Sequence, residues 1–123
     1  MVKLIGILVL SGNLSVAVET DTGFTERSFP NSADGAEELI AYAEQTVGTP
    51  EHGVQIVVGW LDDTVNDKHI MSIFDSFKIP HVVALPRDIH AASTKHKLAE
   101  SSPVAVALSF KDTFPELWKR KSN

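Results

Sequence analysis

The sequence predicts an α/β domain built on a mixed five-stranded sheet, in the strand order 3-2-1-4-5, with helices on both faces. The first observation behind this prediction is an almost unbroken apolar run, Val2 to Leu10, about as long as a strand that is buried on both faces. The second is that two alternating segments follow this run with only short turns between them, as in antiparallel neighbours. The third is that two further apolar runs each follow a helical pattern, which favours parallel strands on the other side of the first run.

The two alternating segments are expected to form strands two and three. Ser11-Gly12-Asn13 is a turn sequence, and Leu14 to Glu19 then alternates as a half-buried strand does. A second turn sequence, Thr20 to Gly23, leads to the alternating segment Phe24 to Phe29. The third strand therefore lies at an edge of the sheet, where charged side chains would protect it.

A helix and a parallel strand come next. Asn31 or Ser32 can cap a helix whose apolar residues recur at helical spacing up to about Gln45. The β-branched run Val54 to Trp60 then predicts the fourth strand, beside the first.

The second half of the chain repeats this alternation. Asp62, Asp63 and Thr64 are expected to form a loop and cap a helix with apolar positions from Val65 to Phe77, and His81 to Leu85 predicts the fifth strand.

Two helices and a tail complete the prediction. Pro86 can open a helix to about Leu98, and Ser102 with Pro103 starts a short apolar helix through Leu108. From about residue 111 we expect a loosely packed tail, held by Trp118. The whole chain, residues 1–123, is predicted to be one domain.

Composition narrows the class of protein. The hydrophobic fraction of 43% and the charged fraction of 22% are typical of a soluble globular protein, and the apolar run at the start is too short to span a membrane. There is no cysteine, which excludes disulfides and thiolate metal sites and makes a cytoplasmic location the default expectation. The net charge of −5 opposes attraction to nucleic-acid phosphates, so any such binding is expected to be weak and local.

Four segments carry a resemblance to a known family. They are GILVLSGNLSVAV (Gly6 to Val18), SFPNSADGAEELIAY (Ser28 to Tyr42), VVALPRDIHA (Val82 to Ala91) and VAVAL (Val104 to Leu108). In these segments and in its element order the chain resembles the N-terminal, RuvC-like domain of the DEDD-type transposases of bacterial insertion sequences, which has a ribonuclease-H-like fold. The resemblance covers roughly Gly6 to Leu108.

The resemblance also implies a site. The family uses four carboxylates to hold two divalent metal ions for phosphodiester cleavage, since hard oxygen ligands suit such ions. The matching positions here are Leu8, Gly59, about Ser101, and Val104, and none carries a carboxylate. The resemblance therefore implies the fold and argues against the activity. We expect no bound metal or cofactor, and we expect Leu8 to pack against the last helices through Val104.

Other polar residues follow the predicted parallel strands and could meet at one edge of the sheet. They are Ser11, Asp62, Asp63, Arg87 and His90. Together they could hold a phosphate or a small anion. Alternatively, the two aspartates and Asp88 cap helices while His90 is a solvated helical residue.

The remaining candidate sites are weaker. The five histidines, at positions 52, 69, 81, 90 and 96, show no zinc-site spacing, and no glycine-rich phosphate loop is present. Lys95, Lys97 and the run Lys119 to Lys121 are basic concentrations that fit a solvated surface better than a nucleic-acid contact.

Three functions remain open. The leading one is a non-catalytic binding or regulatory module, with a protein partner or with self-association through the third strand or the helix carrying Phe74 and Phe77. The second is a cryptic hydrolase or nuclease that uses Asp62, Asp63 and either His90 or Glu100. The third is a nucleic-acid-binding domain without catalysis.

Overall fold

The computed structural model describes residues 3–47 and 53–122. The strands are β1 (Lys3–Val9), β2 (Asn13–Thr20), β3 (Gly23–Pro30), β4 (Val54–Gly59) and β5 (Val82–Ala84). The helices are α1 (Ala33–Val47), α2 (Lys68–Ser76), α3 (Pro86–Lys95), α4 (Pro103–Thr113) and α5 (Pro115–Ser122).

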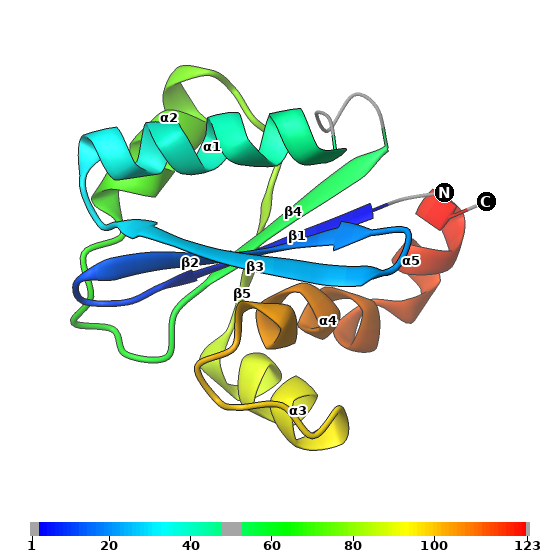
Figure 1. The fold of residues 1–123 in the computed structure, drawn as a ribbon. Helices are drawn as coiled ribbons and strands as arrows, with labels where there is room; N and C mark the ends of the chain where they lie inside the picture. The colour runs from blue at the N-terminus through cyan, green and yellow to red at the C-terminus, as the bar shows by residue number, and fades with distance from the viewer. Residues whose placement is uncertain (1–2, 48–52, 123) are drawn as a thin grey trace.

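The strands form one five-stranded sheet in the order β3-β2-β1-β4-β5, as predicted. β1 and β2 are antiparallel, as are β2 and β3, whereas β4 is parallel to both β1 and β5. Helices α1 and α2 cover one face of the sheet, and α3 and α4 cover the other (Figure 1). The predicted fold class is thus confirmed. In the described part of the chain, no helix is long and apolar enough to cross a bilayer.

The central strand β1 contributes to the core on both of its faces. Ile5, Ile7 and Val9 belong to the apolar cluster beneath α1 and α2. Leu4 and Leu8 belong to a second cluster beneath α3 and α4, which Leu10 joins from a partly buried position. This alternation confirms the prediction that helices bury both sides of the strand.

Gly6 explains how closely α4 approaches β1. A Cβ atom added at Gly6 would lie 2.2 Å from the Pro103 carbonyl oxygen and 2.7 Å from the Ala107 nitrogen. Only a residue without a side chain allows the helix backbone to lie against the strand at this distance. The start of α4 is held as predicted, with Pro103 in its first turn and Ser102 Oγ accepting a hydrogen bond from Val104 N.

The helix α2 begins later than expected. Asp62 Oδ1 accepts hydrogen bonds from the backbone N and the Oγ1 of Thr64, so its carboxylate holds a local turn instead of capping a helix. The N-cap residue of α2 is Asp67, which makes no side-chain capping bond.

The C-terminal region is also more helical than expected. α4 continues beyond Leu108 to Thr113. Ser109 is accommodated in it because its Oγ donates to the Val106 carbonyl oxygen, which satisfies the buried hydroxyl. Phe110 is buried in the next turn. The expected loose tail is the helix α5, from which Trp118 packs against the core cluster beneath α3 and α4.

Candidate functional site

Two of the four positions at which the resemblance places carboxylates lie at the carboxyl ends of β1 and β4. Leu8 and Gly59 are register partners on these two parallel strands. The Leu8 side chain is 0% exposed, within an apolar cluster that also contains Ile89 of α3. This part of the sheet is therefore core.

Gly59 has little room for a side chain of its own. A Cβ atom at Gly59 would lie 2.7 Å from Ile89 Cδ1 and 3.0 Å from the Ala84 carbonyl oxygen. The former distance is too short for ordinary packing, so any side chain at this position would displace α3 or the Ile89 side chain.

The other two positions do not complete a site. Ser101 is exposed in the turn before α4, and Val104 is buried in the first turn of that helix. The cluster that includes Leu8 contains four residues of α4, namely Ala105, Val106, Ala107 and Phe110. Val104, which we predicted to make this contact, is buried outside that cluster.

The five residues of the possible polar cluster do follow the carboxyl ends of the parallel strands. Ser11 lies in the turn after β1, Asp62 and Asp63 follow β4, and Arg87 and His90 lie on α3 after β5. Within residues 3–47 and 53–122, however, no hydrogen bond or ion pair joins any two of them.

Each member of this group with a described partner is engaged elsewhere. His90 Nδ1 lies 3.2 Å from Glu100 Oε1, and both side chains are mostly exposed. The hydrogen bonds from the backbone N and the side chain of Thr64 hold the pKa of Asp62 below its ordinary value. Asp88, the third predicted cap, lies in the first turn of α3, where no side-chain capping bond forms.

Residues 3–47 and 53–122 contain no group of three or more histidine, aspartate or glutamate side chains that could hold a metal ion. His81 Nδ1 lies 2.9 Å from the Ile79 carbonyl oxygen while its ring stacks on Phe74. His52 and the side chains of Lys119 to Lys121 fall outside what the structure describes.

Asn31 is a positioning residue that the sequence reasoning treated only as a possible cap. Its Nδ2 donates hydrogen bonds of 2.9 Å to the carbonyl oxygens of Leu10 and Asn66, and its backbone N donates to the Gly12 carbonyl oxygen. It thereby connects the turns that follow β1, β3 and β4. The cap of α1 is Ser32, whose Oγ accepts from Gly35 N at 3.0 Å.

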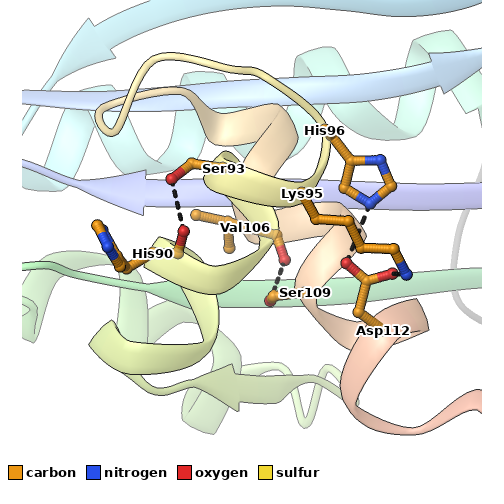
Figure 2. A network of polar contacts seen from close by, with 7 residues as sticks. All are labelled: His90, Ser93, Lys95, His96, Val106, Ser109 and Asp112. Carbon is orange, nitrogen blue, oxygen red and sulfur yellow. Dashed lines mark hydrogen bonds and ion pairs between the residues drawn. The ribbon is translucent and has the colours of Figure 1, made fainter.

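A second polar network, also missed, joins the ends of α3 and α4 (Figure 2). Asp112 Oδ1 lies 3.2 Å from Lys95 Nζ, and Asp112 Oδ2 lies 3.0 Å from His96 Nε2. Asp112 was assigned to a loose tail, and nothing in the sequence pattern indicated that it would face α3. The Lys95 side chain remains 66% exposed in this pair, so the contact partly neutralises a cation that is still on the surface.

No family model and no curated protein matches this sequence. A structure of RuvC from Thermus thermophilus matches over 94% of this chain and 96% of its own, with a TM-score of 0.54 and 11% sequence identity. The structure of T. thermophilus RuvC in complex with a Holliday junction substrate matches over 95% of this chain and 96% of its own, with a TM-score of 0.55 and 9% identity.

The fold is ribonuclease-H-like. This conclusion rests on the shared sheet order and on coverage of nearly the whole chain by both RuvC structures. YeaZ from Pseudomonas aeruginosa is also similar, over 79% of this chain and 50% of its own, with a TM-score of 0.46 and 14% identity. At 9 and 11% identity, the similarity to the two RuvC structures is a similarity of fold alone.

Proposed function

We propose that this chain is a non-catalytic, transposase-derived ribonuclease-H-like domain that acts in the cytoplasm as a binding or regulatory module for a protein partner. The observation that carries the proposal is the packing of Leu8 beside Gly59, under Ile89 of α3.

The physical argument concerns the space that two-metal hydrolysis needs. Such catalysis uses ions about 3.5 to 4 Å apart, held by carboxylates that converge from several elements. Here the same region is occupied by a fully buried leucine and closed by the approach of Ile89 to Gly59. An ion there would have to displace core side chains and would find apolar walls, which supports loss of the metal site.

DNA binding without catalysis is the second candidate. It is favoured by the similarity in fold to the RuvC structure that holds a Holliday junction. The net charge of −5 opposes it, and two of the cations near the C-terminal helices are engaged, Lys95 with Asp112 and Lys111 over the Trp118 ring. Binding to duplex and branched DNA across a salt series tests this candidate, because phosphate contacts weaken steeply as salt rises.

The test of the leading proposal is titration of the purified protein with Mg²⁺ and Mn²⁺, followed by NMR. It is combined with cleavage assays on single-stranded, duplex and branched DNA, and T. thermophilus RuvC serves as the positive control. We expect no saturable shift of amides at the ends of β1 and β4, and no cleavage.

Two results would contradict the proposal. One is a metal ion bound between β1 and β4. The other is metal-dependent cleavage that Asp62→Ala or Asp63→Ala abolishes, which would favour the cryptic nuclease, in which these acids act with His90 or Glu100.

A further inference from the structure

An open pocket of about 270 Å³ lies at the edge of the sheet, between β5 and the helices α3 and α4. Six of its lining residues define what we call the β5 pocket: Val57, Val82, Ala84, Asp88, Phe110 and Phe114. Val57 pairs with Val82, and Gly59 pairs with Ala84, so the side chains of Val57, Val82 and Ala84 face the same side of the sheet. These three side chains form the apolar floor of the pocket.

The helix α4 supplies an aromatic wall. Phe110 is buried and Phe114 is 45% exposed, and their ring centroids lie 5.8 Å apart with the ring planes inclined at 49°. Leu85, which is 46% exposed, lines the pocket from the turn between β5 and α3. A ligand in the pocket would therefore cover apolar surface of Leu85 and Phe114 that is now in contact with water, which favours binding.

The volume of the pocket limits the size of its ligand. A cavity of about 150 Å³ with apolar walls is enough to bind benzene. The β5 pocket is larger than this, and it lies just below the roughly 300 to 1,000 Å³ that is typical of sites for drug-sized molecules. It has space for one ring or branched apolar group with a short chain attached.

Asp88 determines the charge that a ligand of this pocket should carry. It is the one charged residue among those that line the pocket, and it is partly buried in the first turn of α3. No hydrogen bond or ion pair engages its side chain anywhere in the described ranges. Of the two other polar lining residues, Ser109 already donates its hydroxyl to the Val106 carbonyl oxygen, and Thr113 is exposed. An unpartnered carboxylate beside an apolar floor favours a ligand that carries a positive charge and donates hydrogen bonds.

We propose that the β5 pocket binds a small free amine, in which a protonated ammonium group is joined by a short chain to one aromatic ring or branched apolar group. The apolar group lies on the floor beside Phe110 and Phe114, and the ammonium group donates hydrogen bonds to the Asp88 carboxylate. A single compact molecule reaches both, because the floor and the carboxylate line the same pocket on one face of the sheet. This inference goes beyond the proposed function, since it assigns a small-molecule ligand and not a partner protein.

The test is an NMR titration of the full chain with 2-phenylethylamine as the probe. Three control compounds each change one property: 2-phenylethanol removes the charge, 3-phenylpropionate reverses it, and ethylamine removes the ring. We expect 2-phenylethylamine to cause saturable shifts of the amides of residues 82–85 and 110–114, and each control to bind at least about fivefold more weakly.

A pair of aspartate variants separates Asp88 from general attraction of a cation to an acidic protein. Asp88→Asn should weaken binding of 2-phenylethylamine at least about fivefold and change binding of 2-phenylethanol less than about twofold. Asp75→Asn makes the same charge change at an exposed position of α2, on the other face of the sheet, and should change the binding of both compounds less than about twofold.

A pair of phenylalanine variants tests the aromatic wall. Phe114→Ala should weaken the binding of both 2-phenylethylamine and 2-phenylethanol at least about threefold, because both lose the same apolar contact. Phe77→Ala removes a ring that is 72% exposed just after α2 and should change neither. Both rings are substantially exposed, so both variants are expected to fold.

Several outcomes would overturn the inference. They are the absence of saturable shifts up to about 10 mM of 2-phenylethylamine, equal binding of 2-phenylethanol, and equal effects of Asp88→Asn and Asp75→Asn. Tighter binding of a capped lysine than of 2-phenylethylamine would indicate a protein side chain as the occupant, and a concentration-dependent shift of the same amides without any amine would indicate a second copy. None of these results alters the metal titration or the cleavage assays, so the two proposals fail separately.

Discussion

Leu8 of β1 and Gly59 of β4 are register partners, and both lie beneath Ile89 of α3, which approaches the Gly59 backbone too closely to leave space for a side chain there. The pair converts the end of two parallel strands, where ligand sites of open α/β sheets gather, into a continuation of the core.

Leu8→Asp should destabilise the protein strongly. The substitution removes a fully buried leucine and places a carboxylate in an apolar cluster, so we expect the free energy of unfolding to fall by about 3 to 5 kcal/mol or more. Urea unfolding measures the change. Ser11→Asp, which adds the same acid in the exposed turn after β1, should have little effect. A stable Leu8→Asp protein that binds Mg²⁺ at this position would show that the metal site can be restored and would contradict our account of the core.

Gly59→Ala and Gly12→Ala form a matched pair of glycine substitutions. At Gly59 the new methyl group would meet Ile89 Cδ1, the movable end of a side chain, at 2.7 Å and the Ala84 carbonyl oxygen at 3.0 Å, so we expect a loss of about 1 kcal/mol in the free energy of unfolding. At Gly12 nothing lies within 4 Å of the added Cβ atom, and the reduced freedom of the unfolded chain should leave stability unchanged or raise it by about 0.4 to 1 kcal/mol. Chemical unfolding of both variants measures the two changes in free energy. Similar losses at Gly59 and Gly12 would mean that Ile89 does not restrict the space at Gly59.

Asn31→Ala should loosen the turns at the carboxyl edge of the sheet. The variant loses both donors of the Nδ2 group and leaves the carbonyl oxygens of Leu10 and Asn66 without this partner, at an expected cost of about 1 to 3 kcal/mol. Hydrogen exchange should accelerate around these turns, and not in α4. The control is Asn13→Ala, since Asn13 is exposed at the start of β2. Equal effects of the two variants would rule out a special role for Asn31.

Asp62 should titrate below the ordinary range for an aspartate, because the backbone N and the side chain of Thr64 donate to its carboxylate and lower its pKa. A lowered pKa in the folded state means that this contribution to stability is fully present above about pH 4, the unfolded value, and is lost as the pH falls through the folded pKa. Thr64→Val should raise the pKa of Asp62 only part of the way to its ordinary value, because the backbone donor, the larger cause, remains. Carboxyl-carbon NMR across the acid range measures this. An unchanged pKa in the variant would show that the Thr64 hydroxyl makes no contribution.

Much of the fold could be predicted from local patterns. The apolar run around Ile5 and Ile7 indicated a strand buried on both faces, and the short turns after it indicated antiparallel neighbours. Two helix starts were also predicted correctly: the start of α1 from its capping residue Ser32, and the start of α4 from Pro103 in its first turn. Such signals act within a few residues, so they are visible without any tertiary structure.

Local sequence signals predicted helix bounds wrongly where the same polar groups can be satisfied in more than one local structure. Asp62 followed by Thr64 fits a helix cap and an isolated turn equally well, and the turn forms while α2 begins only at Lys68. The apolar helix was expected to end at Leu108, yet α4 continues to Thr113, with the Ser109 hydroxyl satisfied by the Val106 carbonyl oxygen and Phe110 buried.

By itself the sequence determined the strand order, the two-sided burial of β1 and the absence of carboxylates at Leu8, Gly59 and Val104, because residue types and short-range periodicity decide these features. Only the tertiary structure decided that Gly59 is closed by Ile89, that Asn31 joins Leu10 to Asn66, and that Asp112 meets Lys95 and His96. These contacts join residues far apart along the chain, and whether they form depends on how closely the helices pack onto the sheet. That approach is set by the absence of side chains at Gly6 and Gly59 and by the space that the facing residues of α3 and α4 leave to one another.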